Sequence, residues 1–210
     1  MDTKTKAIEA ALTLFAENGY MGTSVKQIAD AVGIKDASLY KHFKSKQEIF
    51  DSIVALINEH ISNLSDVLDL PQQQAPDGAA ADDYKRLNVE DLKDLSEKVF
   101  LFYLTDPYIS KFWRIAHMEQ YRNERIYGMF RKIFMEDAIS YQTWLFGEMM
   151  RSGALHEADA RAVAIGFYAP FFLLLTKYAN QADKQSEALE ILDKQIEEFI
   201  RIYRKEKNED

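Results

Sequence analysis

The segment Ser38–Phe50, SLYKHFKSKQEIF, mixes a tyrosine, a histidine and three lysines with apolar residues. Tyrosine hydroxyls, histidine N–H groups and lysine ammonium groups all donate hydrogen bonds to phosphate oxygens. Leu39 and Phe43 are four residues apart, so a helix would turn both of them inward. The groups left outside would then be Tyr40, Lys41, His42, Lys44 and Lys46. This pattern indicates a surface that binds the backbone of a nucleic acid.

The residues around this segment predict the helices that would position it. Apolar spacing predicts helices over about 4–17, 25–32 and 36–43, and a longer one over about 45–68 that opens with a Ser45-x-x-Glu48 capping box. Thr23 or Ser24 can cap the second helix, and Gly33 suits the tight turn that ends it. Two short helices joined by such a turn form a helix-turn-helix pattern, which places the start of its second helix in the DNA major groove. Here that start is Lys35, Asp36, Ala37 and Ser38.

The same residues resemble a known family. The stretch GTSVKQIADAVGIKDASLYKHFKSKQEIF, residues 22–50, is similar to the N-terminal signature of TetR-family transcriptional regulators, and LFAENGY at 14–20 is similar to the end of that family's first helix. The matching positions are Thr23, Ile28-Ala29, Gly33, Leu39-Tyr40, His42-Phe43, Ser45-Lys46 and Glu48. The resemblance covers about the first quarter of the chain.

The resemblance implies roles for individual residues. It implies phosphate contacts by Thr23, Tyr40, His42 and Lys46. It implies base or groove contacts by Lys35, Ser38 and Lys41, with Gln27 at the edge of the groove. The chain departs from the family at Lys35, where serine is frequent, and at Ala37, where glycine is frequent; Asp36 is therefore expected to cap the third helix. These departures bear on the operator sequence rather than on the mode of binding.

Charge and composition narrow the class of protein. The 210 residues include 26 Lys+Arg and 34 Asp+Glu, and the first 50 residues alone carry a net charge of +1. An acidic body that carries a near-neutral head with local lysines is consistent with an anionic partner for the head. The absence of cysteine removes disulfides, thiolate zinc sites and cysteine nucleophiles. The N-terminus lacks the apolar core of a signal peptide. The apolar run Ala162–Leu175 is short for a membrane span and contains Pro170, so we expect a buried helix there. Both observations predict a cytoplasmic protein with no membrane partner.

The rest of the chain predicts a second helical domain. Residues 71–83 break all periodicity, with two prolines and a glycine, and predict a mobile loop. Beyond it, helices are expected over about 89–104, 108–117, 120–151, 157–180 and 185–206. The fold class is all-α, with an N-terminal three-helix helix-turn-helix domain and a larger C-terminal helical bundle. The expected limits are 1–50 for the DNA-binding domain with a connecting helix to about 68, 69–84 for the loop, and 85–210 for ligand binding and dimerisation.

Aromatic residues are frequent in the second part, and core packing accounts for most of them. A surplus of aromatic residues on helices also builds small-molecule pockets. The resemblance implies a ligand cavity in this domain, and the aromatic residues indicate a small, partly apolar effector. The candidates for lining it are Trp113, His117, Tyr121, Tyr141, Trp144 and Phe171. A structural role for His117 and core positions for Tyr141 and Trp144 are the alternatives. The apolar seams of helices 157–180 and 185–206 favour a four-helix interface in a homodimer.

Two other classes of protein remain as alternatives. An enzyme would need a set of catalytic residues, and the sequence has no H-E-x-x-H motif, no glycine-rich phosphate loop and no G-x-S-x-G motif. A helical protein-interaction module is the other alternative. We expect no catalytic residues, no metal site and no cofactor. The resemblance and the residues together predict a ligand-responsive regulator, most often a repressor, that binds a double-stranded, palindromic operator as a homodimer.

Overall fold

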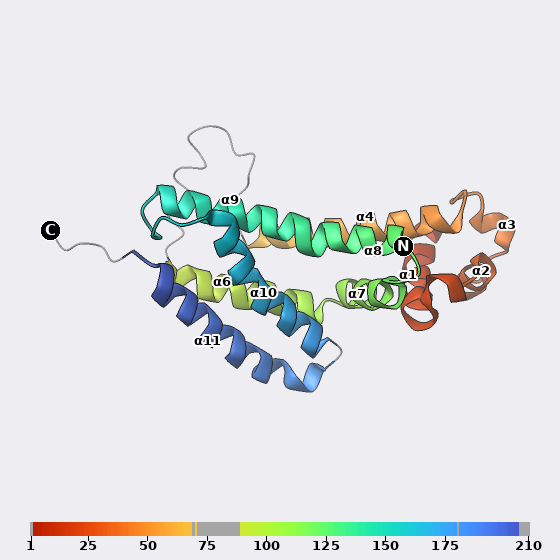
Figure 1. Ribbon diagram of the computed structural model, residues 1–210. Coiled ribbons are helices and arrows are strands. Elements are labelled where there is room, and N and C mark those ends of the chain that lie inside the picture. The colour runs from red at the N-terminus through yellow and green to blue at the C-terminus, as the bar shows by residue number, and fades with distance from the viewer. Residues whose placement is uncertain (1, 69, 71–88, 180, 206–210) are drawn as a thin grey trace. The chain divides into compact units, whose positions relative to one another are not determined.

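The structure is a computed structural model that describes residues 2–68, 70, 89–179 and 181–205 (Figure 1). Its α-helices are α1 Thr3–Gly22, α2 Val25–Val32, α3 Asp36–Leu39, α4 Lys46–Val67, α6 Val89–Thr105, α7 Pro107–Glu119, α8 Glu124–Arg131, α9 Ala138–Arg151, α10 Ala160–Tyr178 and α11 Gln185–Tyr203. Two shorter elements are the π-helix η1 Lys132–Asp137 and the 3-10 helix η2 Ala182–Lys184. Within these ranges the backbone pairs as strand only at the isolated bridge of Leu155 with Arg204. The all-α prediction is confirmed.

Helix boundaries follow local signals where those signals are strong. Asp106 caps α7 by accepting hydrogen bonds from the amides of Tyr108 and Ile109, at the predicted Asp106-Pro107 break. The single helix expected over 120–151 is wrong: Asn123 caps a new helix by accepting from the Ile126 amide, and the π-helix η1 then separates α8 from α9. The predicted loop at 71–83 lies outside the described residues.

Packing divides the chain into two compact units. Unit 1 comprises Met1–Leu64 and Asp106–Ile133, and unit 2 comprises Ser65–Thr105 and Phe134–Asp210. Residues 106–133, which we expected in the second domain, therefore pack with the helix-turn-helix. The functional limits of the domains remain a prediction.

The core of unit 1 brings α7 against the first helices. Phe50 of α4 lies between rings from both parts of the unit, with centroids 6.3 Å from Phe15 and 6.1 Å from Phe112. Phe112 in turn lies 6.4 Å from Phe130 of α8. All four side chains are almost fully buried, so this aromatic chain fixes α7 and α8 onto the three-helix head.

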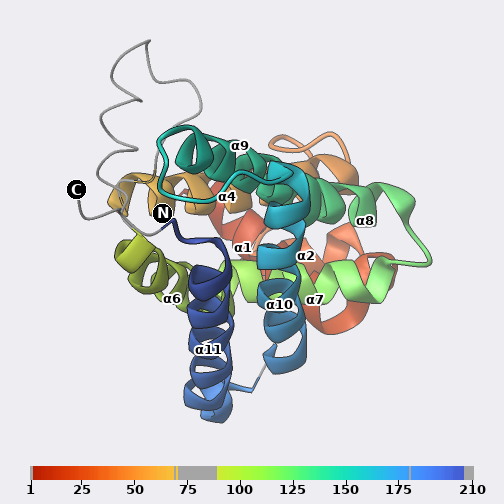
Figure 2. The ribbon, with the colours of Figure 1, turned by 60° about the vertical axis from the view of Figure 1, so that its left-hand side comes forward.

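Unit 2 contains α6, α9, α10 and α11, and Figure 2 shows α10 and α11 side by side. Its buried cluster joins α9 to the last two helices through Phe146, Phe167 and Phe199, whose ring centroids lie 4.8–5.2 Å apart. Leu145, Met149, Val163 and Ala164 complete the cluster with Leu92 and Leu155.

Helix α10 is buried on one face only. We expected a buried helix, and Val163, Tyr168 and Leu174 do lie in the core. The opposite face is exposed in the single chain and carries Ala162, Ile165, Gly166, Ala169, Leu173 and Thr176. Among the described residues, α10 alone has the length and apolar composition of a membrane span, a test that core helices of soluble proteins also pass, and 33% of its most apolar window is buried.

Candidate functional site

The helix-turn-helix is held by local hydrogen bonds. Ser24, the alternative to Thr23, caps α2: its hydroxyl accepts from the Gln27 amide, and the Gln27 side-chain oxygen accepts from the Ser24 amide at 2.7 Å. The turn after α2 uses Gly33 at φ 76°, ψ 31°, a left-handed conformation that glycine adopts without steric cost. The turn predicted from the sequence is therefore present.

The second helix of the pair is shorter than expected. Helix α3 ends at Leu39, and the following residues continue as turns in which the Phe43 amide donates to the Leu39 carbonyl at 3.1 Å. Leu39 and Phe43 are 0% and 2% exposed, in agreement with the expected inward face. The capping role expected for Asp36 is not found: α3 begins at Asp36, and its N-cap, Lys35, makes no side-chain capping bond.

The outer face of this segment carries most of the expected nucleic-acid contacts. Tyr40 is 54% exposed, which is high for a tyrosine. Lys35, Lys41, His42 and Lys44 are exposed as well, and Ser38 is half-buried. The side-chain oxygen of Gln27 is used in the α2 cap, while its side chain as a whole is exposed. Six of the eight predicted contacts therefore share an accessible surface of α2, α3 and the turns after α3, with Ser38 more enclosed than the others.

Thr23 and Lys46 have partners inside the protein. Thr23 is 1% exposed, and its hydroxyl lies 3.1 and 3.0 Å from the carbonyl oxygens of Leu14 and Gly19. The Lys46 ammonium donates to the carbonyl oxygens of Tyr20 and Thr23 at 2.8 and 3.0 Å. Burial lowers the pKa of Lys46. Both side chains secure the corner between α1 and α2.

The start of α4 is capped in a slightly different way from the predicted box. The Ser45 hydroxyl accepts from the Glu48 amide at 3.1 Å, as expected for a capping box. The Glu48 carboxylate reaches back to the amide of Lys44 at 2.6 Å. This bond fixes the loop between Phe43 and α4, so Lys44 is held at the edge of the exposed basic surface.

The six predicted ligand-lining residues are divided between the two units. In unit 1, Trp113 is 7% exposed and stacks on His117, with ring centroids 5.6 Å apart. A His117 ring nitrogen lies 2.8 Å from the Trp113 carbonyl oxygen, a contact that supports the structural alternative for this histidine. Tyr121 lies in the turn after α7 and is 93% exposed, so it does not line an enclosed cavity.

The other three candidates belong to unit 2. Tyr141 and Trp144 contact each other on α9, with centroids 5.5 Å apart. Phe171 of α10 lies in a separate group with Phe100, Tyr103 and Tyr168. The Tyr168 hydroxyl donates to the Phe134 carbonyl at 2.6 Å, within the π-helix η1. Burial raises the pKa of Tyr103 to about 12 and that of Tyr168 still further, so both remain neutral hydrogen-bonding groups.

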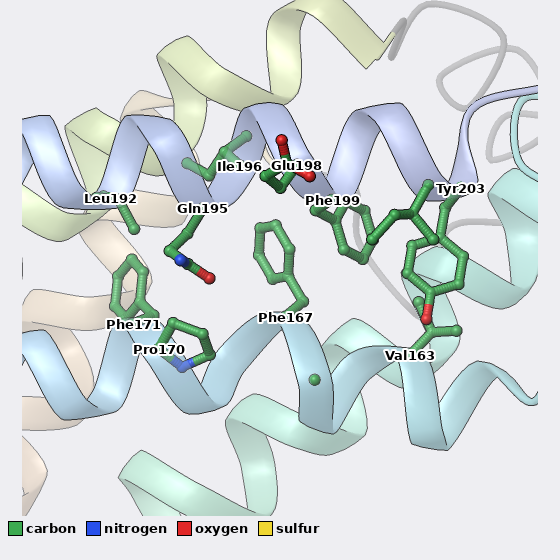
Figure 3. A pocket seen from close by; sticks show the side chains of 12 residues that line it. Val163, Phe167, Pro170, Phe171, Leu192, Gln195, Ile196, Glu198, Phe199 and Tyr203 are labelled. Carbon is green, nitrogen blue, oxygen red and sulfur yellow. The ribbon is translucent and has the colours of Figure 1, made fainter.

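A groove of about 220 Å³ lies between α10 and α11 (Figure 3). In Figure 3 the side chains of Phe167 and Phe171 face those of Leu192 and Phe199 across it. Its other lining residues are Val163, Gly166, Pro170, Gln195, Ile196, Glu198, Ile202 and Tyr203. The groove is open to solvent and mostly apolar. Across the described ranges, no three His, Asp or Glu side chains are grouped in a way that could hold a metal ion.

Comparison with known proteins identifies the helix-turn-helix. Residues 7–53 match the family described as bacterial regulatory proteins, tetR family. Residues 7–53 of this chain therefore form a DNA-binding domain of the TetR type. A curated relative, the biofilm operon icaADBC HTH-type negative transcriptional regulator IcaR of Staphylococcus aureus, is 46% identical over 61 residues, which are 29% of this chain and 33% of IcaR. The chain thus spans about a third of the length of the curated relatives it matches first.

Solved structures share the TetR-family fold over nearly the whole chain. A TetR-family regulator from Mesorhizobium loti has a TM-score of 0.72 at 18% identity and covers 96% of both chains. SmeT, the repressor of a multidrug efflux pump of Stenotrophomonas maltophilia, solved with triclosan, has a TM-score of 0.70 at 20% identity and covers 97% of this chain and 92% of SmeT. At these identities the likeness concerns the fold alone. The family match therefore concerns the first domain, and the likeness of fold covers nearly the whole chain.

Proposed function

We propose that this TetR-family chain is a DNA-binding transcriptional repressor that releases its operator when a small, partly apolar molecule binds the second unit. The observation that carries the proposal is the surface outside Leu39 and Phe43, where Tyr40, Lys41 and His42 are exposed next to a glycine turn. Major-groove docking of this helix would aim hydrogen-bond donors at phosphates on both sides of the groove. The negative regulators among its relatives favour repression over activation.

The residue roles proposed for DNA follow from exposure. Tyr40, His42 and Lys44 would contact phosphates, and Lys35, Ser38 and Lys41 would lie nearest the bases, with Gln27 at the groove edge. Thr23 and Lys46 would act indirectly, because their polar atoms are occupied by backbone carbonyl groups. A protein with these contacts would act in the cytoplasm, where the DNA of a bacterium lies.

A homodimer would place two such helices in successive major grooves of a palindrome, about 34–36 Å apart or a little more. The exposed apolar face of α10, with the neighbouring groove toward α11, supports this part of the proposal. Small residues such as Gly166 and Ala169 would let two α10 helices approach closely. Two copies of the α10–α11 pair would then form a four-helix interface.

The effector would be recognised by aromatic surface with few polar groups. The Phe100, Tyr103, Tyr168 and Phe171 group in unit 2 supplies rings and two neutral hydroxyl groups. The complex of SmeT with triclosan shows that a protein of this fold binds a small aromatic molecule. A coupling of about 1–3 kcal/mol between effector and DNA would change operator affinity 5–150-fold.

The direct test is binding of the purified protein to the DNA upstream of its own gene and of the neighbouring genes, over a salt series. Tight, footprinted binding to a palindrome, with an affinity that falls steeply with salt, is the expected result. Absence of binding to every such fragment at low salt would contradict the proposal. Reporter expression that falls rather than rises on deletion of the gene would identify an activator instead.

A further inference from the structure

A buried carboxylate at the end of α7 contacts the DNA-binding head. Glu119 is the last residue of α7 and is 2% exposed, which is rare for a glutamate. Its Oε1 atom accepts a hydrogen bond of 2.9 Å from the backbone amide of Tyr20, a residue 99 positions earlier in the chain. Both residues belong to unit 1. The bond therefore joins α7 to the last turn of α1.

The backbone of α1 explains why an acceptor is needed there. Gly19 has φ 76° and ψ 162°, so the helix is kinked and the next amide leaves the regular helical ladder. A buried amide without an acceptor costs about 1–3 kcal/mol. Gly19 also makes room for the acceptor, because a Cβ atom at this position would lie 3.1 Å from Glu119 Oε1.

The other side of Tyr20 is held by a positive charge. The Tyr20 carbonyl accepts from the Lys46 ammonium at 2.8 Å, and that ammonium lies 4.3 Å from the centroid of the Tyr20 ring. The Tyr20 hydroxyl lies 3.3 Å from the side-chain oxygen of Gln47. One residue of α1 is thus bonded through its amide to α7 and through its carbonyl to α4.

The two charged groups also act on each other. The pKa of Lys46 is lowered overall by burial, and the negative charge of Glu119 partly offsets this lowering. The second carboxylate oxygen, Oε2, is buried and has no hydrogen-bond donor among the described residues. The Tyr20 amide is the hydrogen-bond donor to this buried carboxylate, and the Lys46 ammonium interacts with its charge.

We propose that Glu119 is a positioning residue for DNA recognition: through the Tyr20 amide it fixes the corner from which α2 and α3 start. Residues 20–24 run directly from this bond to the Ser24 cap of α2. A shift of the C-terminal end of α7 breaks the bond and moves the helix-turn-helix away from its binding geometry. This inference rests on the proposed function.

The sign of the effect on DNA affinity distinguishes positioning from charge. Removal of a negative charge from the head should by itself tighten binding to DNA. Loss of positioning lowers the fraction of protein in the competent geometry and weakens binding by the same factor. Glu17→Ala removes an exposed charge from α1 and is the matched charge control. Leu155→Ala removes a buried side chain from the core of unit 2 without touching the Tyr20 bond, so it is the control for stability.

The experiment measures operator affinity for Glu119→Ala, Glu119→Gln and both controls, well below the unfolding temperature. For Glu119→Ala we expect about a tenfold or greater rise in Kd with an unchanged salt slope, since the number of phosphate contacts stays the same. Glu119→Gln keeps an acceptor oxygen and should recover most of the affinity. Glu17→Ala should bind as tightly as the unaltered protein or more tightly, and Leu155→Ala within about twofold.

Hydrogen exchange measured by mass spectrometry on the same proteins gives a readout that needs no DNA. Faster exchange in residues 19–24 of Glu119→Ala, but not of Leu155→Ala, is the expected result. If the unaltered protein and Glu119→Ala bind DNA equally well, the inference is overturned and the proposed function stands. If the unaltered protein binds no DNA, the proposed function is overturned. If hydrogen exchange in residues 19–24 of Glu119→Ala is then also unchanged, the anchoring by Glu119 is overturned as well.

Discussion

The Lys46 ammonium lies 4.3 Å from the centre of the Tyr20 ring and donates a 2.8 Å hydrogen bond to the Tyr20 carbonyl oxygen. The family resemblance implies a phosphate contact for this lysine, whereas its geometry is that of a cap on the end of α1. A lysine can reach either kind of acceptor, and the sequence alone does not distinguish them. The distinction has measurable consequences for stability and for DNA affinity.

Replacement of Lys46 by methionine should lower stability more than replacement of an exposed neighbour. Lys46→Met leaves the Tyr20 and Thr23 carbonyl oxygens without their donor, which costs about 1 kcal/mol at a partly exposed site. Lys44→Ala removes an equal charge from an exposed position and should leave the urea midpoint unchanged. Equal midpoints for the two variants would show that the Lys46 bonds add nothing to folding.

Variants on the exposed surface should affect DNA binding without affecting folding. Tyr40→Phe removes one hydroxyl donor and should weaken operator binding by roughly fivefold, the effect of about 1 kcal/mol. If Lys41 contacts a phosphate, Lys41→Ala should reduce the slope of log K against log salt by about one. Lys98→Ala, an exposed lysine of unit 2, is the control. The midpoints of thermal unfolding should be the same for all these variants. Unaltered operator affinity in both Tyr40→Phe and Lys41→Ala would mean that DNA binds at another surface.

Alkaline pH should destabilise unit 2 through Tyr103. Its pKa is raised from 10.0 to about 12 by burial. Between pH 10 and pH 12 the unfolded chain has lost the phenolic proton, whereas the folded chain retains it. The free energy of unfolding therefore falls as pH rises through this range, by roughly 1.4 kcal/mol per pH unit. Urea titrations of Tyr103→Phe against the unaltered protein at pH 9 and pH 11 measure this change.

The expected result is that Tyr103→Phe gains stability relative to the unaltered protein as pH rises from 9 to 11. Tyr121→Phe, altered at a side chain that is 93% exposed, should show no such gain. A stability difference independent of pH in the Tyr103 variant would mean that this hydroxyl ionises equally in the folded and unfolded states.

A charge on the exposed face of α10 should prevent dimer formation. Ala169→Asp would bury a carboxylate in the proposed four-helix interface, where an unpaired charge is strongly unfavourable. Sedimentation should show a monomer, with operator affinity lowered because one head replaces two. Ser140→Asp on α9 introduces the same charge at another exposed position and should remain dimeric. A dimer in both variants would exclude this face as the interface.

The sequence was informative where one residue decides the backbone. Gly33 predicts a left-handed turn because other residues adopt that conformation at a cost, and the spacing of Leu39 and Phe43 predicts which face is buried. The contact of Glu119 with Tyr20 was not predictable in this way, because the two residues are 99 positions apart. A buried glutamate at the end of a helix has the same sequence pattern as an exposed one. The π-helix between α8 and α9 also left no local signal.

The bond from Tyr20 to Glu119 matters for the construction of hybrid regulators. Exchange of residues 1–50 between proteins of this fold is the natural way to give a sensor a new operator. A head moved in this way would lose its partners on α7 and α8, because unit 1 includes Asp106–Ile133. The transplanted part should therefore carry the segment 106–133 with it, although 41 residues separate Leu64 from Asp106 in the chain. The portable piece of this protein is discontinuous in sequence.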